Sequence, residues 1–93
     1  MIYVASKLFR MELDRKAIGK RIAKARRSRT PGRGWSQKDL AEAIGLSLHT
    51  IRGWENGLRL PRSVVLGTLA TCLRRSLDWL LLGRGRNARH WKG

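Results

Sequence analysis

The chain has 93 residues, of which 42% are hydrophobic, and this length and composition suit one small folded domain. Its 21 Lys and Arg residues outnumber its 6 Asp and Glu residues, and the net charge of +15 favours a polyanionic partner, either nucleic acid or an anionic membrane surface. The only cysteine, Cys72, excludes an internal disulfide and suits a reducing cytosol, and its separation from His49 and His90 argues against a metal site.

An N-terminal arm precedes the first predicted helix. The opening segment MIYVASKLFR has an apolar run that is too short for a signal peptide or a membrane span. Residues 1–13 are expected to form an arm of uncertain structure or an extra strand, or to be an over-extended start, because MELDRKAIGKR would itself be a natural beginning. Asp14 can cap a helix from about Arg15 to Ser28. Apolar residues recur in it at four- and three-residue steps, which predicts a buried stripe of Ile18, Ile22 and Ala25.

The opposite side of this helix is basic. It carries Lys16, Lys20, Lys24 and Arg27, and like charges at this spacing repel one another by roughly a few tenths of a kcal/mol per pair. The four side chains form either a solvated face or, beside a matching anion, a ridge that faces phosphates. The sequence leaves both interpretations open.

A turn-forming insert separates the first helix from the second. The segment RTPGRG, residues 29–34, breaks the first helix. Ser36 begins the second helix, and Asp39 follows at the spacing of a capping box. Gly45 can adopt the left-handed conformation that ends this helix. Its expected inner face consists of Leu40, Ala41 and Ile44.

The third helix lies within SLHTIRGWENG, residues 47–57. Ser47 caps it, Gly57 ends it, and its inner side consists of Ile51 and Trp54. Gly53 falls inside this helix, on the face that we expect to be exposed. Glycine in a helix interior lowers helix stability by roughly 1 kcal/mol relative to alanine, so its presence here needs an explanation.

Two more helices complete the predicted domain. Pro61 precedes the fourth, and Ser76 caps a brief fifth helix, LDWLLL, which Gly83 ends. The inner stripe of the fourth helix is Val65, Leu66, Leu69, Ala70 and Leu73, with Cys72 beside it as a partly buried structural thiol. The segment RGRNARHWKG, residues 84–93, predicts a flexible basic tail. The sequence therefore predicts an all-α fold, a compact five-helix domain over residues 14–83.

The second and third helices, joined by GLS, fit a helix-turn-helix. The segment WSQKDLAEAIGLSLHTIRGWENGLRLP resembles the helix-turn-helix of the lambdoid phage repressor and Cro-type (XRE) family, and SLDWLLLG matches the usual close of that domain. The resemblance covers residues 15–83 and implies a repressor-like DNA-binding domain. The chain departs from the family pattern at the insert of residues 30–33, at Leu48, where a polar residue is common, and at Arg74, where a helix-ending glycine is usual.

The resemblance implies a surface on the third helix that contacts DNA bases, made of Leu48, His49, Arg52 and Gly53. A helix fits the major groove, and Arg52 can bond guanine bidentately, which is worth ~1–3 kcal/mol of discrimination. His49 can donate or accept a hydrogen bond, and Leu48 or Thr50 can contact a thymine methyl group. For Gly53 two explanations stay open: either the missing side chain lets the helix approach DNA closely, or the position is unconstrained.

The resemblance also implies contacts that position the domain without reading bases. The expected phosphate-contacting residues are Ser36, Gln37, Thr50, Asn56, Arg59 and Arg62. Gln37 would also brace the third helix. Glu55 would pair with Arg26 of the first helix and so tie the third helix to its support.

Together these features predict a sequence-specific regulator of transcription, a repressor that binds double-stranded DNA. We expect a homodimer whose two third helices lie ~34–36 Å apart over an inverted repeat. Its dimer surface would be the region of Trp79 and Leu82 or the N-terminal arm. A cytoplasmic location, with the nucleoid when bound, follows from this role. No cofactor, metal or membrane is expected, and no nucleophile–base group or carboxylate pair suggests an enzyme.

Two alternatives remain. Many antitoxins of toxin–antitoxin pairs use this same domain, so the chain could bind its own promoter and neutralise a toxin protein, and a small adjacent toxin gene would favour that role. The net charge alone would also fit a general polyanion or membrane-surface binder, whose binding salt abolishes without any sequence preference. The neutral helix-turn-helix block argues against this last class.

Overall fold

Five helices make up the part of the chain that the computed structural model describes, residues 14–29 and 32–84. They are α2 (Arg15–Arg27), α3 (Gln37–Ile44), α4 (Leu48–Glu55), α5 (Ser63–Leu73) and α6 (Leu77–Leu82). Within these residues no strand occurs, so the predicted all-α fold is confirmed. The predicted arm, Thr30 and Pro31 of the insert, and the tail after Arg84 lie outside the described residues.

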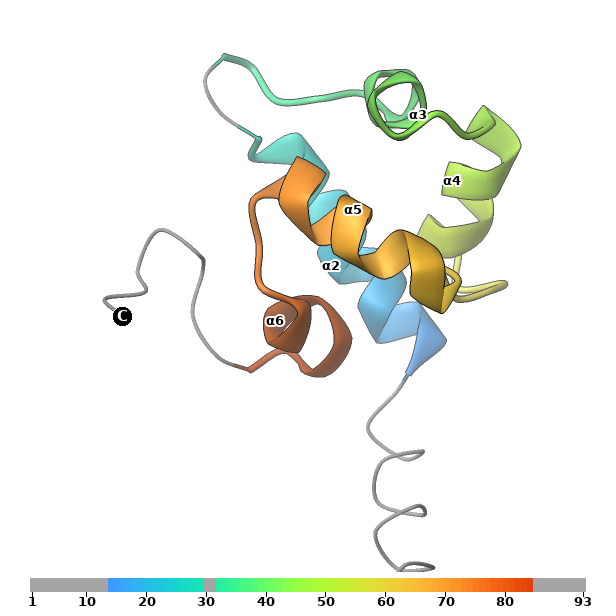
Figure 1. Cartoon of the computed structure of the whole chain (residues 1–93), viewed down its shortest axis with the longest axis vertical. Helices are drawn as coiled ribbons and strands as arrows, with labels where there is room; N and C mark the ends of the chain where they lie inside the picture. Colours follow the sequence, from blue (N-terminus) through green and yellow to red (C-terminus); the bar gives the residue numbers. More distant parts are fainter. Residues whose placement is uncertain (1–13, 30–31, 85–93) are drawn as a thin grey trace, which may run out of the picture.

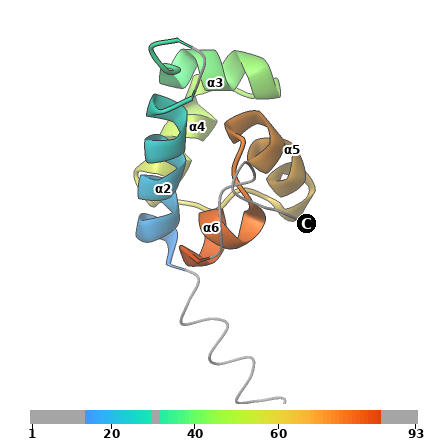
Figure 2. The same cartoon turned by 90° about the vertical axis from the view of Figure 1, so that its left-hand side faces the viewer.

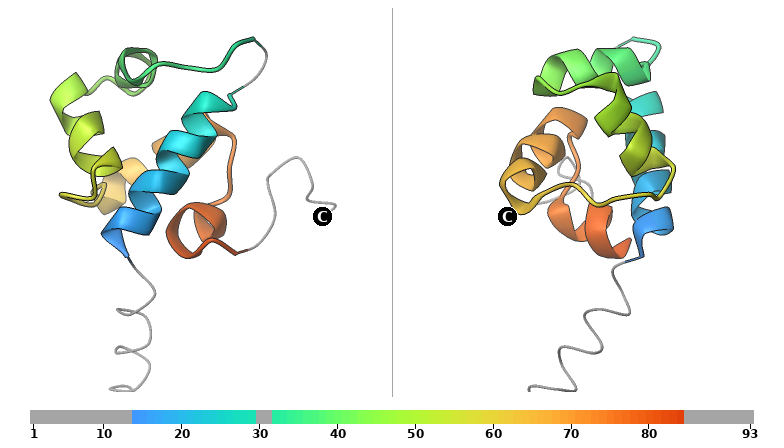
Figure 3. Two further views of the ribbon diagram at one scale, coloured as in Figure 1. Left: turned by 180° about the vertical axis from the view of Figure 1, so that it is seen from behind. Right: turned by 90° about the vertical axis from the view of Figure 1, so that its right-hand side faces the viewer.

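The first of these helices, α2, is the one against which most of the others pack (Figure 1). It packs against α4, α5 and α6, while α3 packs against α4 and α5. Figure 2 shows α2 along one side of the domain, with α3 near its C-terminal end and α5 and α6 on the other side. After α4 the chain crosses the domain to the start of α5, which the right-hand view of Figure 3 shows. No described helix has the length and apolar character needed to cross a membrane.

The apolar faces of all five helices meet in one core. Its buried members are Ile18, Ile22, Ala25, Leu40, Ala41, Ile51, Trp54, Leu69, Ala70, Leu73 and Leu80. Burying each large aliphatic side chain contributes roughly 1.5–3 kcal/mol. Ile44, Val65 and Cys72 are partly buried against this core, so the predicted inner stripes are confirmed except at Leu66, which is half-buried but does not pack against the core. The four basic residues of α2 (Lys16, Lys20, Lys24 and Arg27) are exposed, as expected.

The helix ends follow the predicted signals. Ser36, Ser47 and Ser76 each accept a backbone N–H bond at the start of a helix, and Gly45 ends α3 with a φ of 77°. The expected departure at Arg74 also has a structural consequence. Arg74 adopts the left-handed conformation with a φ of 58°, the only non-glycine residue among those described to do so. The bonds from Arg74 N to Thr71 O, 3.2 Å, and from Arg75 N to Ala70 O, 3.1 Å, close the end of α5 as a glycine would.

Candidate nucleic-acid interface

One side of α4 is buried and the other is exposed. Ile51 is fully buried and Trp54 is 3% exposed, so this face of α4 is fixed against the core. His49 and Arg52, three residues apart on the opposite side, are exposed. The structure therefore leaves both side chains accessible to a partner, which is the condition that base contact requires.

The N-terminal turn of α4 is held by its cap. Ser47 Oγ accepts a hydrogen bond from Thr50 N at 3.1 Å, and its distance to Thr50 Oγ1 is 2.9 Å. The hydroxyl of Thr50 is thus engaged in the cap, while its side chain and that of Leu48 are half-buried. These contacts orient the first turn of α4, where a recognition helix meets bases.

The prediction that Gly53 lies on an exposed face of the helix is wrong. The residue is buried, although it lies away from Ile51 and Trp54 on the helix. A Cβ atom built at Gly53 would lie 3.1 Å from Arg59 Nε and 3.4 Å from Arg59 Cδ. Gly53 is covered by the side chain of Arg59, which belongs to the loop after α4. The spacing of residues in the sequence does not reveal this contact.

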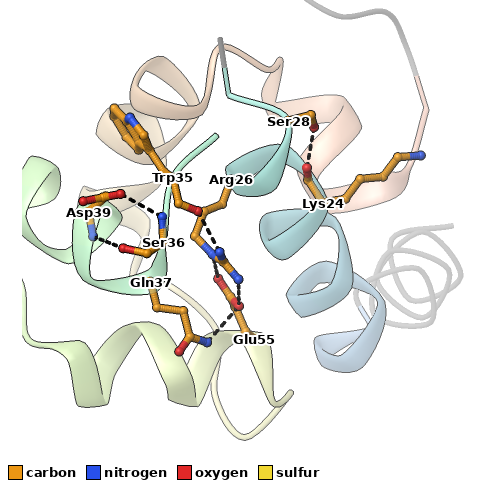
Figure 4. A network of polar contacts seen from close by, with 8 residues as sticks. All are labelled: Lys24, Arg26, Ser28, Trp35, Ser36, Gln37, Asp39 and Glu55. Carbon is orange, nitrogen blue, oxygen red and sulfur yellow. Dashed lines mark hydrogen bonds and ion pairs between the residues drawn. The ribbon is translucent and has the colours of Figure 1, made fainter. Parts of the chain in front are cut away.

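The predicted ion pair between α2 and α4 is present and bidentate (Figure 4). Arg26 Nε donates to Glu55 Oε2 at 2.7 Å, and Arg26 Nη2 donates to Glu55 Oε1 at 2.8 Å. Their side chains are 8% and 5% exposed. Removal of both groups from water costs free energy, so the pair is better understood as fixing geometry than as adding net stability.

Two further contacts join this pair to the start of α3. Gln37 Nε2 donates to Glu55 Oε1 at 3.0 Å, and Arg26 Nη1 donates to the carbonyl oxygen of Trp35 at 2.8 Å. Figure 4 shows the Arg26 guanidinium between the Glu55 carboxylate and the Trp35 carbonyl. The bracing contact of Gln37 with the third predicted helix is therefore present, and α4 is fixed relative to both α2 and α3.

The predicted capping box at the start of α3 also forms. Ser36 N donates to Asp39 Oδ2 at 2.9 Å, and Asp39 N donates to Ser36 Oγ at 3.0 Å. The backbone N–H of Ser36, followed by its side chain, lowers the pKa of the Asp39 carboxyl. The helix start that sits beside the Arg26–Glu55 pair is therefore secured by its own local contacts.

Two arginines have roles that the sequence did not indicate. Arg21 Nε and Nη2 donate to the carbonyl oxygens of Leu80 and Leu81, at 2.8 and 2.9 Å, and so satisfy the end of α6. Partial burial lowers the pKa of this guanidinium. Arg29 donates to the carbonyl oxygen of Cys72 at 2.6 Å and stacks on the Trp35 ring. Both act on segments far away in the sequence, which no local signal predicts.

The residues expected to contact phosphates gather around the ends of α3 and α4. Ser36, Asn56, Arg59 and Arg62 are exposed, and Gln37 is half-buried because it bonds Glu55. Lys16 lies beside the turn that follows α4, since a Cβ at Gly57 would approach Lys16 Cγ to 2.7 Å. Positively charged side chains therefore lie near the C-terminal end of α4.

Comparison with known proteins gives one match. A helix-turn-helix family model matches residues 22–80, which include α3, α4 and α5 entirely. No match was found among curated proteins or among solved structures. The matched range contains the braced helix pair and its exposed side.

Proposed function

Because the chain belongs to the helix-turn-helix family of the Cro/repressor (XRE) type, a family of DNA-binding transcription regulators, we propose that it is a sequence-specific repressor. Its α4 would enter the major groove of double-stranded DNA. The observation that carries this proposal is the exposure of His49 and Arg52 on α4, opposite the buried Ile51 and Trp54. A rigid helix with exposed donors fits the major groove, where the pattern of acceptors is unique to each base pair.

The base contacts would be made by the exposed side of α4 and by its first turn. Arg52 would bond guanine O6 and N7, His49 would donate to or accept from a neighbouring base edge, and Leu48 would contact a thymine methyl group. The braced position of α4 supports this, because a helix that is fixed against α2 and α3 loses little freedom on binding.

Phosphate contacts would position the helix. We assign them to Ser36, Gln37, Thr50, Asn56 and Arg62, which lie at the helix ends or in the loop after α4. The positive end of the α3 dipole lies beside Ser36 and Gln37, although the N–H groups of Ser36 and Asp39 are already engaged in the capping box.

The protein would act as a homodimer on an inverted repeat, with its two α4 helices ~34–36 Å apart. One short helix contacts few base pairs, so a symmetric pair doubles the sequence that is read. Trp79, a candidate for the dimer surface, is partly buried against the core, with Arg75 over its ring at 5.3 Å. A repressor of this kind would be found in the cytoplasm, with the nucleoid when bound.

Selection from random DNA at two salt concentrations tests the proposal. We expect an enriched inverted repeat that survives the higher salt, and a complex of two chains per site. Arg52→Ala is expected to lower affinity for the selected site by roughly 5- to 100-fold, with a smaller loss on random DNA. As a control, Lys20→Ala removes one exposed charge outside α4 and should lower affinity for all sequences by the same small factor.

Two results would contradict the proposal. One is the absence of any enriched sequence, with binding that disappears as salt rises, because that is the behaviour of a general polyanion binder. The other is an equal, sequence-independent loss for Arg52→Ala and Lys20→Ala, because Arg52 would then act through its charge alone.

A further inference from the structure

The side chain of Arg59 packs closely against the position that a side chain at residue 53 would take. A Cβ atom at Gly53 would lie 3.1 Å from Arg59 Nε, 3.4 Å from Cδ and 3.5 Å from Cγ, and no other residue supplies its three nearest atoms. Gly53 follows His49 by four residues, so the two share one row on the side of α4 away from the core. Arg59 therefore lies across the exposed side of α4, in line with His49.

The turn after α4 holds Arg59 there. Gly57 has a φ of 74°, and its N–H donates to Trp54 O at 3.1 Å, while Leu58 N donates to Gly53 O at 2.9 Å. This pair of bonds is the Schellman arrangement, which reverses the chain at a helix end. Pro61 is buried, so the loop is fixed again soon after Arg59.

The hydrogen-bond donors of Arg59 are available to a ligand. Its side chain is exposed, and within residues 14–29 and 32–84 its guanidinium makes no hydrogen bond or ion pair. The contact with Gly53 involves the inner atoms of the side chain, so the outer nitrogens are left for other partners.

We propose that Arg59 is a specificity-determining residue that bonds a guanine in the major groove in place of the side chain that Gly53 lacks. This rests on the proposed function and revises the sequence-based expectation, in which Gly53 met bases and Arg59 met phosphates. An arginine is suited to the task because its planar group matches guanine O6 and N7. Packing across Gly53 orders the side chain before DNA binds, which reduces the entropy lost on binding. Glycine at position 53 is thus explained by the arginine above it.

The test uses the operator selected by the wild-type chain and a set of operators with single base-pair changes. Arg59→Ala should weaken binding to the selected operator by roughly 5- to 100-fold and abolish the preference at one G·C pair in each half-site. Gly53→Ala should weaken the preference at that same pair, because Arg59 must shift by a few tenths of an ångström to make room for the added methyl group. The double variant should bind like Arg59→Ala. Arg62→Ala, a change of the same charge in the same loop, should weaken binding to all operators equally.

Equal weakening by Arg59→Ala on every operator, as for Arg62→Ala, would overturn the proposal and return Arg59 to phosphate contact. So would a Gly53→Ala variant whose base preference is unchanged.

A measurement without DNA separates this proposal from the proposed function. Since alanine favours a helix over glycine, Gly53→Ala should raise the Tm by several degrees more in the Arg59→Ala chain than in the wild type. Equal shifts in the two backgrounds would show that Arg59 is not held against Gly53, and would overturn the inference. A wild-type chain that selects no sequence would instead refute the proposed function.

Discussion

Gly19 of α2 lies against the carbonyl oxygen of Trp54 in α4, and a Cβ atom at position 19 would come within 2.3 Å of that oxygen. The carbonyl oxygen of Glu55 would lie 2.9 Å from the same atom. Both neighbours are backbone, which cannot move without displacing the end of α4. The absence of a side chain at Gly19 therefore sets how closely α2 supports α4, and it lets Arg26 reach Glu55 on the same pair of helices.

Gly19→Ala should destabilise the fold. An added methyl group at a filled site costs about 1–3 kcal/mol, and the gain in helix propensity, at most ~1 kcal/mol, offsets only part of this. We expect a net loss of about 1–2 kcal/mol in the free energy of unfolding, measured by urea denaturation. Gly67→Ala is the matched control, because Gly67 is exposed within α5 and nothing lies within 4 Å of its Cβ position. That variant should gain about 0.5–1 kcal/mol. If Gly19→Ala is as stable as Gly67→Ala, α2 and α4 do not meet at this contact.

Breaking the Arg26–Glu55 pair from both sides should cost less than the sum of the two single changes. Glu55→Ala leaves the Arg26 guanidinium buried without its carboxylate, and we expect a loss of about 3 kcal/mol. Arg26→Ala should cost a similar amount, because it leaves Glu55 with only the Gln37 amide. The double variant should lose less than the sum by roughly 2 kcal/mol, which a double-mutant cycle in urea measures.

Glu55→Gln provides a second test of the pair if Glu55→Ala does not fold. It keeps the shape and removes the charge, so its loss should be intermediate. Strictly additive losses in the cycle would mean that the two side chains do not interact in solution.

The fold could be predicted because its signals are local. The spacing of Ile51 and Trp54 in one helix, the Ser36–Asp39 pair and the left-handed turn at Gly45 each depend on residues only a few positions apart. Helix periodicity and caps act at that range, so the sequence predicts the elements and their inner faces. The pair of Arg26 and Glu55 came from the family resemblance, since nothing local links positions 29 residues apart.

The sequence did not predict the contacts that side chains make after the chain folds back on itself. Gly53 lies on the outward side of α4 by periodicity, yet it is buried because the turn at Gly57 brings Arg59 back over it. Arg21 was one of many basic residues until the structure placed it on the last carbonyls of α6. Both relationships are tertiary, and periodicity carries no information about them.

Arg74→Gly should be more stable than Arg74→Ala. A non-glycine residue in the left-handed region costs roughly 1–2 kcal/mol, whereas glycine adopts it freely but loses more entropy on folding. We expect Arg74→Gly to be more stable than Arg74→Ala by about 1 kcal/mol, or roughly 4–8 °C in Tm. The comparison with alanine removes the contribution of the arginine side chain, which both variants lack. Equal Tm values for the two variants would show that α5 does not end in a left-handed residue.

Asp39→Ala should destabilise the protein at neutral pH, and this difference should disappear in acid. The capping box lowers the pKa of the Asp39 carboxyl, chiefly through the backbone N–H of Ser36, so the folded state favours the ionised form. A carboxyl whose folded pKa lies below its unfolded value of about 4 contributes stability that is fully present above that pH. The contribution is lost as pH falls through the lower, folded pKa. Urea unfolding of wild type and variant between pH 7 and pH 2 should therefore give two curves that converge below about pH 4. Curves that stay parallel over this range would mean that the cap does not depend on the charge of Asp39.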